Sequence, residues 1–335
     1  MKGFSLGIMI FFALILTSCG TKDQDPNLSD KEPHLSDQDN HLFDNPRIDY
    51  TFIVVGDTQP PTTEDQMQLI NKIISERPDF VIHAGDFVDI GTEEEWQRVD
   101  NTFGRVMDAG IPVYPVLGNH EYANAGGRLS DTEDKMKLYF DRFPHLKGNK
   151  WYSFKYGNIT FIMLDSTHMH FLEKEDWDSD PQVKWYKTAI DRTGMKIVTI
   201  HHPMVTYSGA GAEIQEVYMR MLLKEAIDTH LTSALVFSGH IHNFQAINDG
   251  KMYYIVTGGG AGGIDGKGTP ISYNTIDGYE LIMTYRPHYV KAIASEDRLD
   301  MEVLILDKEN HQWVKGKKLT ATNISEVLYR PTRYD

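Results

Sequence analysis

Residues 80–89 read FVIHAGDFVD, and residues 51–59 read TFIVVGDTQ. In both stretches a run of mostly apolar, β-branched residues stops at a glycine that precedes an aspartate. Such runs favour buried strands, and glycine permits the tight turn that follows each of them. One Gly-Asp after a strand is usually only a turn. Two of them predict carboxylates that lie close together where neighbouring strands end.

Three further stretches have the same form. Residues 113–121 read VYPVLGNHE, residues 197–203 read IVTIHHP, and residues 235–242 read LVFSGHIH. Polar side chains at the carboxyl ends of parallel strands meet in the crevice outside the sheet. Asp, Asn and His at these strand ends therefore predict one cluster of oxygen and nitrogen donors. Donors of this kind suit hard or borderline cations.

The segments between these strand ends indicate an α/β domain. Helices are predicted at two capping boxes, Thr63 with Gln66 and Thr92 with Glu95, and at Asp180-Pro181. A further helix is predicted at 213–229. The predicted strands are 51–55, 80–84, 113–117, 159–164, 197–200 and 235–238, followed after Gly250 by 252–256, 280–285 and 301–306.

The composition narrows the function classes. The chain has 335 residues, of which 41% are hydrophobic, so it can bury a sizeable core. Its 33 Lys and Arg against 48 Asp and Glu give a net charge of −15, which disfavours a nucleic-acid scaffold as partner. Its one cysteine, Cys19, excludes an internal disulfide, a thiolate zinc site and an iron–sulfur cluster. A bound metal must therefore use oxygen and nitrogen ligands.

The N-terminus resembles a bacterial lipoprotein signal. Lys2 precedes an apolar run at 4–16, and Leu-Thr-Ser-Cys ends at Cys19. The run is too short to span a bilayer, which takes roughly 20 residues. The alternative is an ordinary secretory signal with an incidental cysteine. We expect a signal peptide at 1–18, a lipidated Cys19 with a disordered acidic tether at 19–45, and one domain at 46–335.

This N-terminus implies a location in the cell envelope. A lipidated Cys19 would anchor the protein to a membrane through its acyl chains and leave the domain in water, outside the cytoplasm. The acidic residues that follow Cys19 also resemble surface-export signals of some outer-membrane lipoproteins. We therefore expect a membrane contact through the lipid in the cell envelope, and the sequence leaves open the inner membrane, the outer membrane and the cell surface.

Together the polar strand ends resemble the motifs of the calcineurin-like metallophosphoesterase family. The motifs, in chain order, are GDTQ (56–59), GDFVD (85–89), GNHE (118–121), IHHP (200–203) and GHIH (239–242). The stretches 151–166 and 258–263 also resemble members of this family. The resemblance implies a four-layer αββα sandwich of two mixed β-sheets flanked by helices. It also implies hydrolysis of a phosphate-ester substrate with two divalent or trivalent metal ions, Mn, Fe or Zn.

The resemblance assigns ligands residue by residue. Asp86 lies where the family has its bridging carboxylate. The other implied ligands are Asp57 and His242 on one metal and Asn119, His201 and His240 on the other. Gln59 departs from the commonest first motif, Asp-x-His, so it is either a weak ligand or a partner of a bound water. Asp89 stands where purple acid phosphatases carry Tyr, so a tyrosinate–iron site is not expected.

The resemblance also implies an acid. His120 is expected to protonate the leaving oxygen, and Asp89 to orient His120 and keep it protonated. The sequence leaves three functions open: a phosphomonoesterase, a phosphodiesterase, and a non-catalytic binding lipoprotein that retains the fold. It indicates no obligatory protein partner.

Several other polar residues have structural interpretations. We expect His202 to pack or hydrogen-bond beside the ligand His201, and His83 to be hydrogen-bonded within its strand. We expect His168 and His170 on a surface loop. Glu121 and Asn243 adjoin ligands, so we expect them at the rim or behind the ligands. The glycine run at 258–263 lacks the Lys-Ser/Thr of a phosphate loop, so it predicts a close approach of backbones.

Overall fold

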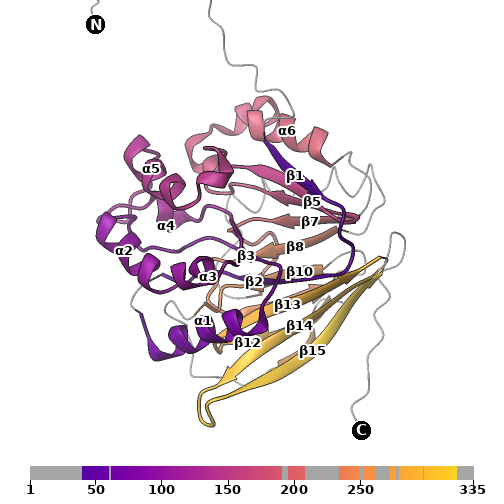
Figure 1. Ribbon diagram of the computed structural model, residues 1–335. Coiled ribbons are helices and arrows are strands. Elements are labelled where there is room, and N and C mark those ends of the chain that lie inside the picture. Colours follow the sequence, from indigo (N-terminus) through magenta and orange to yellow (C-terminus); the bar gives the residue numbers. More distant parts are fainter. Residues whose placement is uncertain are drawn as a thin grey trace, which may run out of the picture. The chain divides into compact units, whose positions relative to one another are not determined.

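The computed structural model describes residues 40–59, 62–190, 195–207, 234–248, 253–260, 272–276, 279–296 and 298–322. In these residues the chain forms two β-sheets that pack face to face, with helices on their outer faces (Figure 1). The predicted four-layer α/β sandwich is therefore confirmed. Among the described residues, no helix is both long and apolar enough to cross a membrane.

The first sheet is mixed and has the strand order β1-β5-β6-β7-β8-β10-β9-β12-β11. Its parallel centre is formed by β6, β7, β8 and β10, and β9, β12 and β11 extend it antiparallel. The strands are β1 (His41–Asn45), β5 (Tyr152–Tyr156), β6 (Ile159–Met163), β7 (Met195–Thr199), β8 (Ala234–Ser238), β9 (Phe244–Asn248), β10 (Tyr253–Thr257), β11 (Ser272–Ile276) and β12 (Tyr279–Thr284). The motifs at 200–203 and 239–242 follow β7 and β8 directly.

The second sheet has the order β15-β14-β13-β2-β3-β4. Its strands are β2 (Tyr50–Val55), β3 (Phe80–His83), β4 (Val113–Pro115), β13 (His288–Ser295), β14 (Arg298–Asp307) and β15 (Gln312–Thr322). β2, β3 and β4 are parallel, whereas β13, β14 and β15 form an antiparallel meander. The first three motifs follow the parallel strands, so all three reach the same edge of this sheet.

The helices α1, α2 and α6 begin where the capping residues predict. Thr63 Oγ1 accepts from Gln66 N at 3.1 Å, Thr92 Oγ1 accepts from Glu95 N at 3.3 Å, and Asp180 caps the helix at Pro181. The described helices are α1 (Glu64–Glu76), α2 (Glu93–Asn101), α3 (Gly104–Asp108), α4 (Asn119–Tyr122), α5 (Glu133–Arg142) and α6 (Pro181–Ala189), with 3-10 turns η1 (Pro144–Leu146), η2 (His168–Phe171) and η3 (Lys174–Ser179). The helix predicted at 213–229 lies outside the described residues.

Aromatic rings join the two sheets. Phe52 stacks on Phe80 in the second sheet at 5.2 Å, and Phe154 stacks on Phe161 in the first at 4.7 Å. The two pairs meet edge to face, with Phe52 5.3 Å from Phe161. Edge-to-face rings attract through complementary quadrupoles and exclude water. Apolar residues of α1 pack on the second sheet and those of α6 on the far face of the first.

The predicted boundary of the tether is wrong at its C-terminal end. Residues 41–45, expected to be disordered, form β1 and pair parallel with β5. Phe43 of β1 packs 5.3 Å from Phe154 and 5.6 Å from Tyr114. These partners are more than 70 residues away in sequence, so the local acidic composition hides the strand. The predicted signal peptide, Cys19 and residues 20–39 lie outside the described residues.

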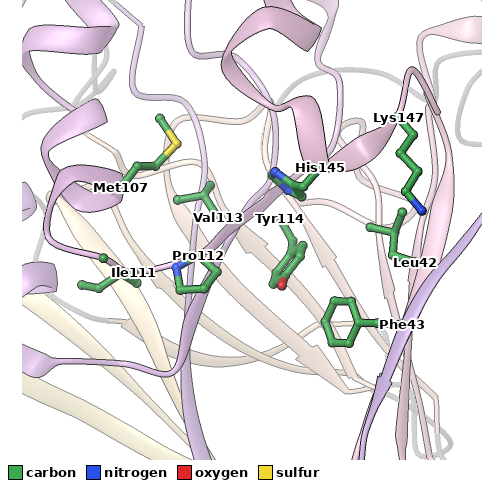
Figure 2. Close-up of a pocket in the computed structure, with 10 residues that line it drawn as sticks. Leu42, Phe43, Met107, Ile111, Pro112, Val113, Tyr114, His145 and Lys147 are labelled. Carbon is green, nitrogen blue, oxygen red and sulfur yellow. The ribbon is translucent and has the colours of Figure 1, made fainter.

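A cavity of about 580 Å³ lies between the edge strands β1 and β4 (Figure 2). Its wall is mostly apolar and is lined by Leu42, Phe43, Met107, Gly110, Ile111, Pro112, Val113, Tyr114, His145 and Lys147. None of the predicted ligands lines it. This cavity is therefore separate from the predicted metal site.

Glu76 at the end of α1 ties this helix to β13, and we predict that Glu76→Gln destabilises the fold. Lys72 and Lys291 each donate to its carboxylate at 2.6 Å. Burial alone would raise the pKa of Glu76, but the two lysines outweigh it and lower the pKa to about 2. The folded-state pKa lies below the unfolded one, so this stabilisation is present above about pH 4.5 and is lost toward pH 2.

The expected loss in unfolding free energy at pH 7 is about 1 kcal/mol, measured by urea titration. The difference between Glu76→Gln and wild type should shrink as the pH falls below about 4.5. Glu309→Gln, at an exposed turn, is the matched control and should change little. A difference that stays constant from pH 7 to pH 3 would contradict this account.

Candidate metal centre

Two buried aspartates follow β2 and β3. Asp57 and Asp86 are 0% and 1% exposed, and both have positive φ, at 62° and 61°. Asp tolerates this left-handed conformation better than most residues, at a cost of about 1–3 kcal/mol. The two turns are bonded to each other, since Asp57 N donates to Gly85 O and Thr58 N donates to Asp86 O, both at 2.9 Å. These bonds fix the backbone of the two turns, and thus the positions of the two carboxylates, relative to each other.

Glu121 holds the third strand end against the second. Its carboxylate accepts from three backbone N–H groups, those of Asp86 (3.0 Å), Phe87 (2.7 Å) and Gly118 (2.7 Å). Burial, followed by the charge of Asp86, raises the pKa of Glu121 to about 7. A Cβ at Gly118 would overlap the Asp86 carboxylate, so glycine is required there. Glu121 lies behind the ligands, and its side chain does not reach the rim.

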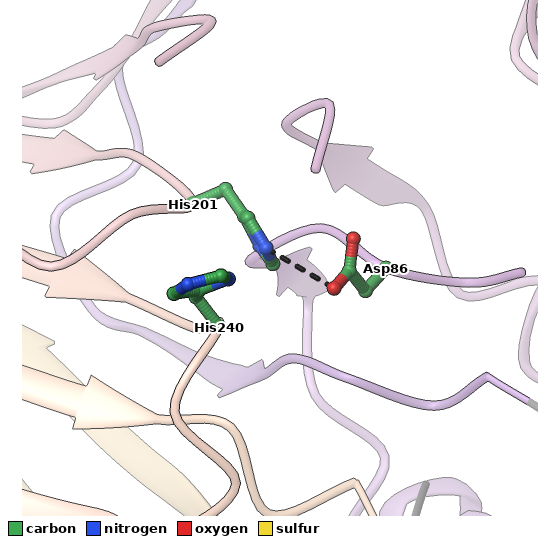
Figure 3. A group of neighbouring side chains, drawn as sticks. All are labelled: Asp86, His201 and His240. Atoms are coloured by element: carbon green, nitrogen blue, oxygen red, sulfur yellow. Dashed lines mark ion pairs between the residues drawn. The ribbon is translucent and has the colours of Figure 1, made fainter. Parts of the chain in front are cut away.

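One group of donors gathers around Asp86. Asp86, His201 and His240 offer ligand atoms that all lie within 4.8 Å of one another, and Figure 3 shows the His201–Asp86 ion pair. His201 Nε2 lies 3.1 Å from Asp86 Oδ2 and 3.0 Å from Asn119 Oδ1, and His240 Nδ1 also lies 3.0 Å from Asn119 Oδ1. The predicted set Asp86, Asn119, His201 and His240 is therefore brought together.

The tautomer of His201 suits a metal ligand. Its Nδ1 lies 2.8 Å from Ala84 O and donates to that carbonyl, which directs Nε2 toward Asp86. Burial would lower the pKa of His201, but the Asp86 carboxylate outweighs burial and raises the pKa to about 10. This proton on Nε2 faces Asp86, where a bound cation would replace it. His240 lacks this compensation, so burial, and then His201, lower its pKa to about 3.

A second group of donors gathers around Asp57. His242 Nε2 lies 3.4 Å from Asp57 Oδ1 and 3.3 Å from Gln59 Nε2. Gln59 is 4% exposed, and its Oε1 is buried with no hydrogen-bond partner. A buried amide oxygen without a partner costs about 1–3 kcal/mol. An acceptor of this kind beside a carboxylate and an imidazole fits a second cation, which Gln59 Oε1 would help to hold.

The predicted acid His120 lies beside this centre, but Asp89 contacts it differently from the prediction. His120 Nδ1 lies 2.6 Å from the backbone carbonyl of Asp89, and the Asp89 carboxylate is not the partner. Burial lowers the pKa of His120, but Asp86 and the Asp89 carbonyl outweigh it, so the pKa lies above its ordinary value. The 35% exposed side chain points Nε2 away from the carbonyl and 4.0 Å from Asp86 Oδ2.

The other histidines mostly match their structural interpretations. His83 is buried and hydrogen-bonded to Thr58 Oγ1 at 2.9 Å. His202 is bonded through Nδ1 to Ser166 Oγ at 2.9 Å, and its ring lies 4.5 Å from that of His240. His170 is exposed as expected. His168 is not a free surface histidine, because it pairs with the buried Asp180 at 2.8 Å.

Sequence reasoning missed a buried polar group beside the centre. Asp165, two residues after β6, accepts from Tyr122 Oη at 2.5 Å and from the backbone N–H groups of Thr167 and His168. Tyr122 belongs to α4, so Asp165 connects the first sheet to the helix that carries Asn119. The sequence signal was present, since Leu-Asp-Ser ends a strand as the other motifs do. Asn243, which follows His242 in the sequence, is buried and therefore does not lie at the rim.

The described part of the glycine run lies against the centre. A Cβ at Gly258 would meet Asp57 Oδ2 at 2.8 Å, and a Cβ at Gly260 would overlap Gly56 O. Gly260 N donates to Gly56 O at 2.9 Å. The close backbone approach is therefore confirmed for residues 258–260, and residues 261–263 lie outside the described part of the chain.

Comparison with known proteins agrees with this geometry. Residues 50–244 match the family model described as calcineurin-like phosphoesterase. A probable glycerophosphodiester phosphodiesterase of Arcobacter nitrofigilis is 24% identical over 50% of this chain and 57% of its own length. A serine/threonine-protein phosphatase of Bos taurus is 24% identical over 53% of this chain and 58% of its own length. The chain thus spans less than three fifths of these curated relatives.

Solved structures share the fold. A dimetal phosphatase from Danio rerio superposes with a TM-score of 0.55 at 15% identity, covering 82% of this chain and 99% of that one. A Plasmodium protein described as the anchor in the inner membrane complex superposes with a TM-score of 0.60 at 17% identity, covering 84% and 90%. At such identities the likeness concerns the sandwich alone.

The unpartnered oxygen of Gln59 generates a prediction for metal binding. Gln59→Leu keeps the volume but removes the acceptor, so we expect one of the two Mn²⁺ ions to bind about 10-fold more weakly while the other is unchanged. Calorimetric titration of the metal-free protein with MnCl2 measures both affinities. Gln97→Leu, on the exposed face of α2, is the matched control. Equal affinities in Gln59→Leu and wild type would show that Gln59 is not a ligand.

Proposed function

Since this chain belongs to the calcineurin-like phosphoesterase family, we propose that it hydrolyses phosphate esters at a centre of two metal ions. The observation that supports this most strongly is the convergence of donors from both sheets. Asp57, Asp86 and Asn119 come from the second sheet, and His201, His240 and His242 come from the first. Asp86 would bridge the ions, with Asp57, Gln59 and His242 on one side and Asn119, His201 and His240 on the other.

The donor set determines the chemistry. Carboxylate, amide and imidazole ligands suit Mn, Fe or Zn. Such ions, when bound, stabilise negative charge on the phosphoryl group and supply a nucleophile from water near neutral pH. The chain itself supplies the fixed ligand positions, because the two aspartate turns are bonded to each other and Glu121 is bonded to the turn at Asp86.

His120 is the proposed acid. Hydrolysis joins a water oxygen to phosphorus and breaks the bond from phosphorus to the leaving oxygen, which must then gain a proton. The Nδ1 proton of His120 is committed to the Asp89 carbonyl, so the proton available for transfer is on Nε2. This atom belongs to a partly exposed ring, which a substrate can reach. General acids of this kind raise the reaction rate by about 10²–10⁴-fold.

The substrate class has two candidates. One curated relative is named a phosphodiesterase and another a phosphatase, so the comparison supports a diester and a monoester equally. A non-catalytic binding lipoprotein is the weakest candidate, because the donor set and His120 are all present. The proposed positive centre in an acidic chain provides local attraction for either ester.

We predict that His120→Ala lowers kcat by about 10²–10³-fold and leaves two metal ions per chain. Turnover of paired chromogenic mono- and diesters with Mn²⁺, Fe²⁺ or Zn²⁺, together with metal analysis by mass spectrometry, measures both. His145→Ala, at the cavity between β1 and β4, is the control and should retain wild-type turnover. No turnover of either ester by metal-loaded wild type would favour the binding lipoprotein. Joint loss of metal and activity in His120→Ala would make His120 structural.

We further propose export and lipid anchoring at Cys19, which the Leu-Thr-Ser-Cys sequence supports. The prediction is that the expressed wild-type chain incorporates labelled palmitate and partitions into the detergent phase of Triton X-114. Cys19→Ser should abolish both, because the thiol is the acceptor of the lipid. Ser18→Ala, which keeps the cysteine, is the matched control. Label in Cys19→Ser equal to wild type would disprove the anchor.

A further inference from the structure

The peptide that joins Asp89 to Ile90 is bonded at both of its polar atoms. Its carbonyl oxygen accepts from His120 Nδ1 at 2.6 Å, and its N–H donates to Glu95 Oε2 at 2.8 Å. Glu95 is 6% exposed, and its Oε1 lies 3.9 Å from Arg98. A buried carboxylate and the acid imidazole therefore lie at opposite ends of one peptide dipole.

The next carbonyl along the chain is bonded to a cation. Lys135 of α5 donates from Nζ to Ile90 O at 2.6 Å and also to Ala123 O. Ala123 ends α4, the helix that carries His120. Lys135 thus connects the segment that accepts from the acid to the segment that carries it. The packing here is close, since a Cβ at Gly91 would lie 3.3 Å from Lys135 Nζ and from Glu121 O.

We propose that Glu95 and Lys135 are positioning residues for His120, an inference that rests on the proposed function. They fix the Asp89–Ile90 peptide, and this peptide fixes the imidazole so that Nε2 faces the leaving oxygen. A carboxylate that accepts from the N–H of a peptide polarises that peptide, and the carbonyl oxygen of the same peptide becomes a stronger acceptor. Glu95 therefore orients His120 through the Asp89–Ile90 peptide, the role that the sequence assigns to the Asp89 carboxylate.

The side chain of Glu95 supports this role. In a reciprocal capping box the residue three positions after the cap bonds back to the cap's own N–H. Glu95 occupies that position after Thr92, but its carboxylate passes the cap and bonds Ile90 N instead. Thr92 still caps the helix by accepting from Glu95 N, whereas the Glu95 carboxylate bonds the loop beside the metal centre.

The test uses Glu95→Gln and Lys135→Met with esters of different leaving groups. A nitrophenyl ester has a good leaving group that needs little protonation, whereas an unactivated phenyl ester needs the acid. We expect kcat for the phenyl ester to fall about 10-fold in each variant, kcat for the nitrophenyl ester to fall less than about 3-fold, and KM to stay constant. The matched controls are Glu94→Gln and Lys137→Met, exposed residues on the same two helices.

Two further measurements separate positioning from a general loss of structure. In a His120→Ala background, neither variant should lower kcat further, because the acid it positions is already absent. In the metal-free protein, amide exchange at Ile90 should be faster in both variants, while the amides of β2 and β3 stay protected. Equal losses for both esters, or additive losses with His120→Ala, would overturn the proposal.

The outcomes also separate this proposal from the proposed function. If metal-loaded wild type hydrolyses neither ester, the proposed function fails, and amide exchange at Ile90 still tests the contacts: unchanged exchange overturns the positioning role and faster exchange supports it. If wild type hydrolyses both esters and the variants show no leaving-group dependence, the proposed function stands and the positioning role fails.

Discussion

The burial of two carboxylates side by side is the constraint on which the structure depends. Asp57 and Asp86 are shielded from water, and an ion of this kind costs several kcal/mol to bury unless it is paired. The surrounding groups are arranged to offset this cost: His240 N donates to Asp57 and His120 N donates to Asp86, each at 3.0 Å. His201 adds a positive charge beside Asp86, a role that a bound metal cation would take over in the proposed centre.

A sandwich of two sheets satisfies this constraint because neither sheet carries enough donors alone. The second sheet supplies the carboxylates and the first supplies the imidazoles. The seam between them runs directly beside the centre, where Gly56 N donates to Thr257 O at 3.0 Å and Gly260 N donates to Gly56 O at 2.9 Å. The glycines of this seam carry no side chain because a Cβ would meet backbone or a ligand. The aromatic contacts of the core join the same two sheets, so they also hold the carboxylates of the second sheet at a fixed distance from the imidazoles of the first.

Features with a local signal could be predicted from the sequence, and features that depend on distant partners could not. The parallel strands, the helix caps at Thr63 and Thr92 and the donor types at the strand ends all follow from short stretches. β1 has no local signal, because the partly buried ring of Phe43 packs against rings far along the chain. The contact of His120 with the Asp89 backbone depends on the turn after β3. A sequence motif cannot tell whether the side-chain carboxylate or the backbone carbonyl of Asp89 is the partner. Glu95 matches a capping signal, yet its carboxylate accepts from Ile90 N and not from the N–H of the capping residue Thr92.

The remaining carboxylates bear on how a chain of charge −15 could present the proposed positive centre to a phosphate ester. Glu121, Glu95 and Asp165 all lie close to the ligand loops, and each is turned toward backbone N–H groups. A carboxylate satisfied in this way holds a loop in place and leaves the coordination of a cation to Asp57 and Asp86. In the proposed centre, two divalent ions against these two carboxylates would give a charge of about +2, and Gln59 and Asn119 would contribute neutral oxygens. The division of acidic residues between loop support and the proposed metal coordination would thus set the sign of the electrostatic field at the substrate.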